Sequence, residues 1–105
     1  MWSSNAQLVR SARNGNVDAV RRALNAGVSV NTRPYGWGGV TPLMFAVEHG
    51  RMRVVRLLLD RGANVNALDM DQRTPLMYAA IKGRLEIARL LIERGANIGL
   101  TSNNG

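Results

Sequence analysis

The chain has 105 residues, the size of one small domain, and its 46% hydrophobic content is ordinary for a globular protein. It contains no cysteine, which excludes a disulfide framework and cysteine-based metal sites. The net charge is +7, and no secretory leader pattern or apolar run of membrane-spanning length is present, so we expect a basic, cytoplasmic protein.

Residues 1–31 predict an N-terminal capping repeat. We expect Ser3, Ser4 or Asn5 to cap its first helix. Arg10 stands where the later units carry aromatic residues, and a polar outer face is typical of a terminal cap. The small and apolar residues of this unit match a later set at an offset of 35 positions: Leu8, Ser11, Ala12, Gly15, Val20, Leu24, Gly27 and Asn31 match Leu43, Ala46, Val47, Gly50, Val55, Leu59, Gly62 and Asn66.

Residues 32–39 predict an extended loop that contains a two-residue insertion, because the later units repeat at an offset of 33 rather than 35. Trp37 lies in this loop among three glycines. The glycines do not indicate a phosphate-binding loop, since no Lys-Ser/Thr pair follows them.

Residues 40–72 and 73–105 are two copies of one unit. Thr-Pro-Leu-Met occurs at 41–44 and again at 74–77, and Gly-Ala-Asn at 62–64 returns at 95–97. A fixed period in the low thirties predicts one structural unit stacked on copies of itself. Such stacks usually present an extended binding surface rather than a catalytic pocket.

The residue types within one copy predict two helices. Thr74 is a suitable N-cap, and Pro75 suits the first helical position, where no N–H is needed. Gly83 predicts the end of this helix, since the residue after a helix often has positive φ. Apolar residues at helical spacing predict a second helix over 85–93, which Gly95 ends.

These residues resemble the ankyrin-repeat family. The resemblance rests on Thr-Pro-Leu at 41–43 and 74–76, on Ala46 and Ala79, and on Gly-Ala-Asn-Val-Asn at 62–66. It implies an all-α repeat fold, an α-solenoid of about three helix-turn-helix units, with six helices in all and β-hairpin-like linking loops.

The sequence departs from the family pattern at three positions. Met44 and Met77 replace the usual His after Thr-Pro-Leu, and that His normally helps to tie neighbouring hairpins by hydrogen bonds. Gln72 stands where the family prefers Gly, which makes the turn before Thr74 less typical.

The resemblance implies a non-catalytic protein–protein interaction module: an adaptor, inhibitor or regulatory subunit. Its partners are expected to contact the hairpin tips and the exposed positions of the first helices on the concave side. For Trp37, contact with a partner and packing of the lengthened loop against Tyr35 or Pro34 are both open. The positions carried over from the family are Arg13, Asn14, Trp37, Val40, Glu48, His49, Met70, Asp71, Arg73, Ile81 and Lys82.

The sequence offers no catalytic, cofactor-binding or metal-binding constellation. His49 is the only histidine and lacks the partners that an acid–base site requires. Asp69 and Asp71 provide fewer oxygen ligands than a metal ion needs. Asp69 matches a family position that commonly stabilises the turn, so a structural role is favoured.

Thirteen of the 14 basic residues are Arg, and many recur at fixed repeat positions: Arg21, Arg56 and Arg89; Arg51 and Arg84; Arg61 and Arg94. A solvated outer face is the favoured interpretation, with Arg56–Asp60 and Arg89–Glu93 ion pairs along the second helices. The alternative is electrostatic binding of nucleic acid or another acidic surface. Phe45 and Tyr78 are expected in the core between repeats rather than as a platform for stacked bases.

The last unit lacks an obvious C-terminal cap. Leu90, Leu91 and Ile92 are as apolar as their counterparts Leu57, Leu58 and Leu59, which are expected to cover the next repeat. Continuation into further repeats, end-to-end self-association and a frayed last helix are all open. A regulatory piece of a larger enzyme is a further alternative.

Overall fold

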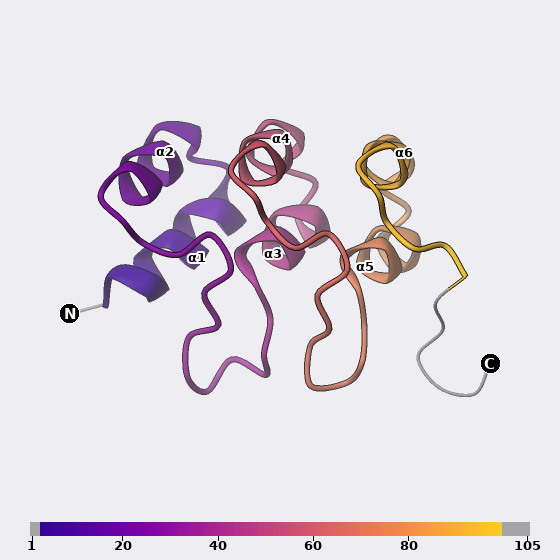
Figure 1. The fold of residues 1–105 in the computed structure, drawn as a ribbon, viewed down its shortest axis with the longest axis horizontal. Coiled ribbons are helices and arrows are strands. Elements are labelled where there is room, and N and C mark those ends of the chain that lie inside the picture. The colour runs from indigo at the N-terminus through magenta and orange to yellow at the C-terminus, as the bar shows by residue number, and fades with distance from the viewer. Residues whose placement is uncertain (1–2, 100–105) are drawn as a thin grey trace.

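Six α-helices in three successive pairs make up residues 3–99, the part of the chain that the computed structural model describes (Figure 1). The predicted all-α repeat stack is therefore confirmed, and this part of the chain contains no β-strand. None of its helices has the length and apolar character needed to cross a membrane. The helices are α1 Ser4–Asn14, α2 Val17–Asn25, α3 Pro42–Glu48, α4 Met52–Asp60, α5 Pro75–Lys82 and α6 Leu85–Glu93.

The helices form two rows. The first helices of the pairs, α1, α3 and α5, pack side by side, and α2, α4 and α6 form a second row, drawn above them in Figure 1. The first loop (residues 26–41) and the second loop (residues 61–74) project away from the second row. The first loop is two residues longer, as the change in repeat offset predicts.

The helix starts follow local rules that are visible in the sequence. Ser3 Oγ accepts a hydrogen bond from the Ala6 amide at 3.1 Å and caps α1. Thr41 Oγ1 accepts from the Met44 amide at 3.2 Å, and Thr74 caps α5 in the same way. The Met44 sulfur in turn accepts from the Thr41 amide at 3.4 Å, so a thioether completes the capping box in which Glu or Gln is usual.

Gln72 has a left-handed backbone, with φ of 65°, and is the only non-glycine residue with positive φ among residues 3–99. This conformation explains why the family prefers Gly at this position, because a Cβ atom costs about 1–2 kcal/mol in it.

A continuous hydrophobic core runs through all three pairs. Leu8, Leu43, Leu58 and Leu91, one or two from each pair, are almost completely buried. Each such side chain stabilises the fold by about 1.5–3 kcal/mol relative to its exposed state. Because neighbouring pairs share this core, no pair buries its apolar face alone.

Arginines join consecutive helix pairs. Arg51 Nε donates to the Arg13 carbonyl at the end of α1 at 2.9 Å, and Arg84 Nη2 donates to the Glu48 carbonyl at the end of α3 at 3.0 Å. Both arginines satisfy carbonyl groups that a helix C-terminus leaves without intrahelical partners. This repeat position therefore has a structural role.

Glycines leave room for these two arginines. A Cβ atom on Gly15 would lie 2.9 Å from Cδ of Arg51, and one on Gly50 would lie 3.1 Å from Cζ of Arg84. The recurrence of Gly with Arg at these positions thus reflects close packing as well as a left-handed backbone.

A second recurring arginine position also joins consecutive helix pairs, here through the second row. Arg61 Nη2 donates to Asn25 Oδ1 at 2.9 Å, and Arg94 Nη2 pairs with Asp60 Oδ1 at 2.9 Å. The expectation that Asp60 pairs with Arg56 of its own helix is wrong, because Asp60 lies closer to the next pair's arginine. The expected Arg89–Glu93 pair is also not formed in residues 3–99.

Asparagines at the loop starts add a third link at each junction. Asn31 Oδ1 accepts from the Asn64 amide at 2.8 Å, and Asn66 Oδ1 accepts from the Asn97 amide at the same distance. The two junctions between helix pairs are therefore built in the same way.

The three apolar residues named at the end of the last helix differ in burial. Leu90 and Leu91 are buried in the shared core, whereas Ile92 is 46% exposed. From the start of α6 to residue 99, the exposed large apolar side chains are Leu85, Ile92 and Ile98. The end of the predicted last unit, residues 100–105, lies outside the described residues.

Candidate partner-binding surface

The two loops and the helices α1, α3 and α5 lie on one side of the molecule, opposite α2, α4 and α6, and we call this side the loop-side surface (Figure 1). Two of the predicted site residues have large apolar side chains that are exposed on it. Met70, in the second loop, is 78% exposed, and Ile81, on α5, is 67% exposed. The prediction that apolar side chains lie exposed among charged ones is correct for these two residues.

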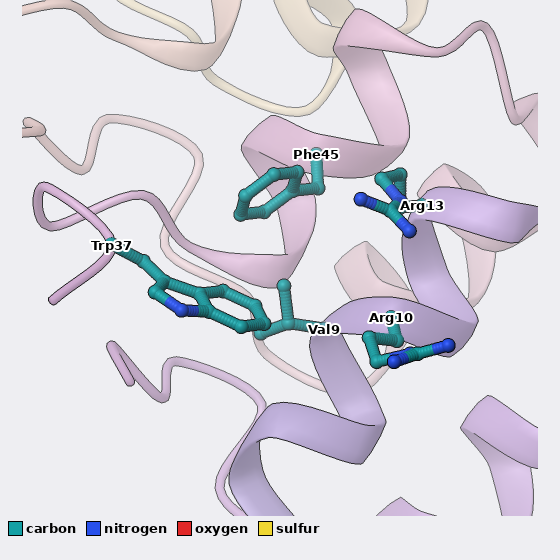
Figure 2. A pocket seen from close by; sticks show the side chains of 5 residues that line it. All are labelled: Val9, Arg10, Arg13, Trp37 and Phe45. Carbon is teal, nitrogen blue, oxygen red and sulfur yellow. The ribbon is translucent and has the colours of Figure 1, made fainter. Parts of the chain in front are cut away.

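A pocket of about 220 Å³ lies on this surface between α1, α3 and the first loop (Figure 2). Trp37 reaches it from the loop and Phe45 from α3, and α1 contributes Val9, Arg10 and Arg13. The walls are aromatic and aliphatic, and the two guanidinium groups lie at its α1 side. The pocket therefore offers both an apolar surface and positive charge to a ligand.

Trp37 is half-buried, not fully exposed. Its ring meets the Phe45 ring edge-on, with 5.8 Å between the centroids and an interplanar angle of 72°, a favourable aromatic geometry. The lengthened loop thus folds back, but onto α3 and α1. Tyr35, one of the two expected packing partners, is fully exposed instead.

A wider hollow, of about 510 Å³, lies between the two loops. The Met70 amide donates to the Gly38 carbonyl at 2.9 Å, and Arg33 Nη1 donates to the Leu68 carbonyl at 2.8 Å. These bonds fix the spacing of the loops. Tyr35 and Met70 line this hollow and point their apolar surface to solvent.

Asp69 organises the second loop. Its Oδ1 accepts from the amides of Asp71 at 2.8 Å and Arg73 at 2.9 Å, and its Oδ2 accepts from Arg73 Nε and from the Tyr78 hydroxyl. Burial alone would raise the pKa of the Asp69 carboxyl, but these hydrogen bonds, led by that from Tyr78, hold the pKa below its usual value. Asp69 stabilises the turn, as its repeat position implies.

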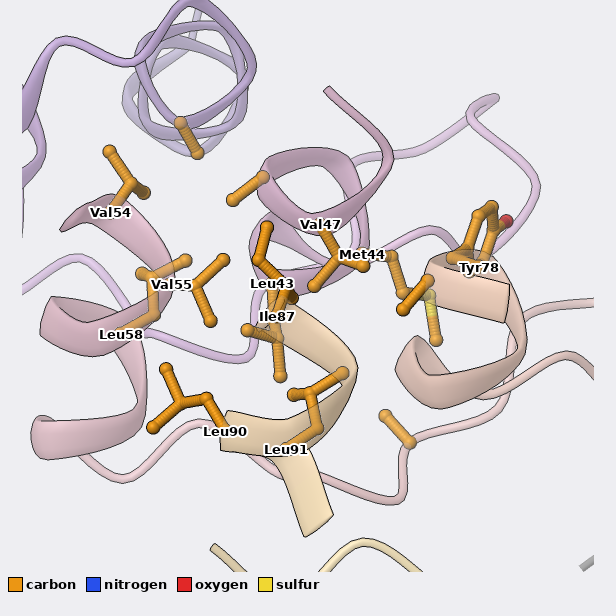
Figure 3. Packing of buried hydrophobic residues seen from close by; sticks show 14 of the residues in the cluster. Leu43, Met44, Val47, Val54, Val55, Leu58, Tyr78, Ile87, Leu90 and Leu91 are labelled. Carbon is orange, nitrogen blue, oxygen red and sulfur yellow. The ribbon is translucent and has the colours of Figure 1, made fainter. Parts of the chain in front are cut away.

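Tyr78 connects this loop to the core (Figure 3). Its side chain is buried, and the Arg73 guanidinium lies 5.3 Å from its ring centroid. Burial and the adjacent carboxylate raise the pKa of the Tyr78 hydroxyl, which therefore stays protonated and donates to Asp69. The prediction that Tyr78 lies in the core is confirmed, whereas Phe45 is half-buried and forms a pocket wall.

Several predicted site residues form ion pairs with one another. Arg73 Nη2 lies 2.9 Å from Asp71 Oδ2, and Lys82 Nζ lies 3.9 Å from Glu48 Oε2 across α3 and α5. His49 lies exposed at the end of α3, with Nδ1 3.0 Å from the Phe45 carbonyl. The predicted site residues Asp71, Arg73, Glu48 and Lys82 thus balance one another's charge.

Two predicted site residues lie elsewhere. Val40 is half-buried and packs against the core, so it supports the loop rather than offering free surface. Asn14 is exposed at the end of α1, where it lines a separate depression with the start of α4.

The sequence prediction missed three pocket residues: Val9, Arg10 and Phe45. The available signals were Arg10 at an otherwise aromatic repeat position and the insertion that carries Trp37. Neither signal indicates which helix the inserted loop folds onto.

Comparison with known proteins identifies the repeats independently. A family model described as ankyrin repeats, in three copies, matches residues 8–102. The chain is also similar to proteins named ankyrin repeat, SAM and basic leucine zipper domain-containing protein 1. Identity over 61 residues is 46% for that of Carollia perspicillata, 44% for that of Rhinolophus ferrumequinum and 48% for that of Notamacropus eugenii. The aligned segment covers 57% of this chain and 12% of each relative.

Proposed function

Because the chain belongs to the ankyrin-repeat family, whose repeats are generally protein–protein interaction modules and typically non-catalytic, we propose that it binds a protein partner on the loop-side surface. The partner would rest across the two loops and the first-helix row. Since both junctions are held by the same three links, the surface would reorganise little on binding, which lowers the entropic cost of association.

The observation that carries this proposal is the exposure of Met70 and Ile81. Large apolar side chains surrounded by charged groups on one face are typical of binding surfaces, whose centres are richer in Met and aromatic residues than the rest of a protein surface. The Trp37 pocket and the hollow between the loops lie on the same face.

Two of the three recurring arginine positions give little support to nucleic-acid binding. Arg51, Arg84, Arg61 and Arg94 each donate to the neighbouring helix pair, so their guanidinium groups serve the scaffold. A ligand that used them would compete with these bonds.

A capture experiment with surface variants tests the proposal. The intact chain is used to isolate partners from the source cell, and capture is compared with that of Met70→Ser and Ile81→Ser. We expect each substitution to reduce capture of a specific partner about tenfold or more, as for residues at the centre of an interface.

Leu85→Ser is the matched control. Leu85 is 76% exposed on α6, in the second row, so its substitution removes a similar apolar area away from the proposed surface. Capture lost in Leu85→Ser but kept in Ile81→Ser would contradict the proposal. A steep fall of affinity with salt concentration would favour the electrostatic alternative instead.

A further inference from the structure

We propose that the Trp37 pocket anchors an acidic segment of the protein partner, in which one large apolar side chain enters the pocket and a nearby carboxylate binds Arg13. This inference rests on the proposed function and names the chemistry of the partner. It is carried by the size of the pocket, its walls and the position of the charge.

The size of the pocket favours a single side chain. Sites for small molecules typically measure about 300–1,000 Å³, and this pocket measures about 220 Å³. Trp37, Phe45 and Val9 line it with two aromatic rings and a branched aliphatic group (Figure 2). An aliphatic or aromatic side chain would fill this hollow and cover the half-buried Trp37 ring.

The charge at the rim favours a carboxylate. Arg10 and Arg13 are three residues apart on α1 and therefore lie on the same face of the helix. Arg13 is exposed, and within residues 3–99 its guanidinium forms no ion pair. A guanidinium group binds a carboxylate through two parallel hydrogen bonds, and the neighbouring aromatic walls reduce screening by water.

The charges at equivalent repeat positions indicate how a bound partner segment would be oriented. Glu48 occupies on α3 the position that Arg13 occupies on α1, so the charge along the first-helix row changes sign from the first pair to the second. An extended partner segment would therefore place its acidic end over α1. A nucleic-acid strand fits less well, because beyond the pocket its phosphates would meet Glu48 and Asp71, which already pair with Lys82 and Arg73 and so leave no excess positive charge there.

Selection from a random peptide library tests the inference while the natural partner is unidentified. A phage-displayed library of random dodecapeptides is selected on the immobilised intact chain, in parallel with the variants Arg13→Glu and Arg56→Glu. Arg56, exposed on α4 in the second row, is the matched charge-reversal control. Circular dichroism melting of each variant establishes that it is folded.

We expect the intact chain and Arg56→Glu to select peptides with one large apolar residue and an Asp or Glu at a fixed spacing. Arg13→Glu should keep the apolar preference and lose the acidic one. A peptide selected on the intact chain should bind Arg13→Glu about tenfold or more weakly, as expected for loss of a charge-assisted contact. Its binding should also change the fluorescence of a Trp2→Phe variant, in which Trp37 is the only tryptophan.

The remaining outcomes separate this inference from the proposed function. Peptides whose binding depends on Met70 and Ile81 but not on Arg13 would overturn the inference and leave the proposed function standing. Peptides that bind only the second row would overturn both. Displacement of selected peptides by a single-stranded oligonucleotide, with Arg13-dependent affinity, would overturn the choice of a peptide ligand.

Discussion

Replacing Tyr78 by Phe should destabilise the fold through one buried hydroxyl group. The ring, and with it the core packing and the Arg73 contact, is kept, while the ionised Asp69 loses one of its four donors. A hydrogen bond to a charged group contributes about 1.5–3 kcal/mol, and the three remaining donors place the loss near the lower end. For a domain of this size, 1 kcal/mol corresponds to about 4–8 °C in melting temperature, so a loss of about 1.5 kcal/mol should lower it by about 6–12 °C.

The loss should depend on pH in a defined direction. The folded-state pKa of Asp69 is lowered, so its ionised form contributes stability above the unfolded-state pKa, near 3.8. This contribution is lost as pH falls through the folded-state pKa. The difference in melting temperature between the native chain and Tyr78→Phe should therefore be full at neutral pH and narrow below about pH 4.

Thermal unfolding followed by circular dichroism measures both effects. Tyr35→Phe is the control, because Tyr35 is the only other tyrosine and is fully exposed, so its substitution should leave the melting temperature unchanged. A shift for Tyr78→Phe no larger than that of the control, or a shift that does not depend on pH, would refute the argued role of the hydroxyl group.

Three further substitutions test the scaffold. Gln72→Gly should raise the free energy of unfolding by about 0.5–1 kcal/mol in urea titration, because relief of the left-handed strain exceeds the added chain entropy. Asn66→Ala should cost about 1 kcal/mol and speed hydrogen exchange at the Asn97 amide, which loses its acceptor. Arg84→Met should cost about 1 kcal/mol in urea titration, because the Glu48 carbonyl loses its two guanidinium bonds.

Each of these three predictions can be contradicted by a specific result. A loss of stability in Gln72→Gly would show that the Gln side chain has a role beyond its backbone conformation. Unchanged exchange at Asn97 in the Asn66 variant would show that the Asn66 acceptor does not protect this amide. If Arg56→Met destabilises the chain as much as Arg84→Met, the effect comes from net charge and not from the link to Glu48.

The sequence predicts the repeating scaffold well, because its signals are local. The cap at Thr74, the proline after it and the helix over 85–93 all follow from residue types within one unit, and the structure confirms each. Repetition at a fixed period then fixes which helices are neighbours. Gln72 illustrates the same point, since the sequence marks the turn there as less typical and its backbone is left-handed.

The candidate site is harder to predict, because its members come from different units. Trp37 meets Phe45 and Val9 only after the inserted loop has folded onto α1 and α3, and no spacing in the sequence specifies that direction. The same limit explains the wrong Asp60 pairing: the rule for charges four residues apart considers one helix, while the stronger partner, Arg94, comes from the next pair.

The first loop shows that a loop in this architecture can change in length without disturbing the links that stabilise the stacked helix pairs. It is two residues longer than the second loop, yet the Arg51, Arg61 and Asn64 links at its junction match those made by Arg84, Arg94 and Asn97 at the next. The insertion leaves the stacking of the helix pairs intact because it is accommodated at the loop tip. Loop tips are therefore the natural positions at which to graft new recognition sequences onto this chain, with the links between pairs left untouched.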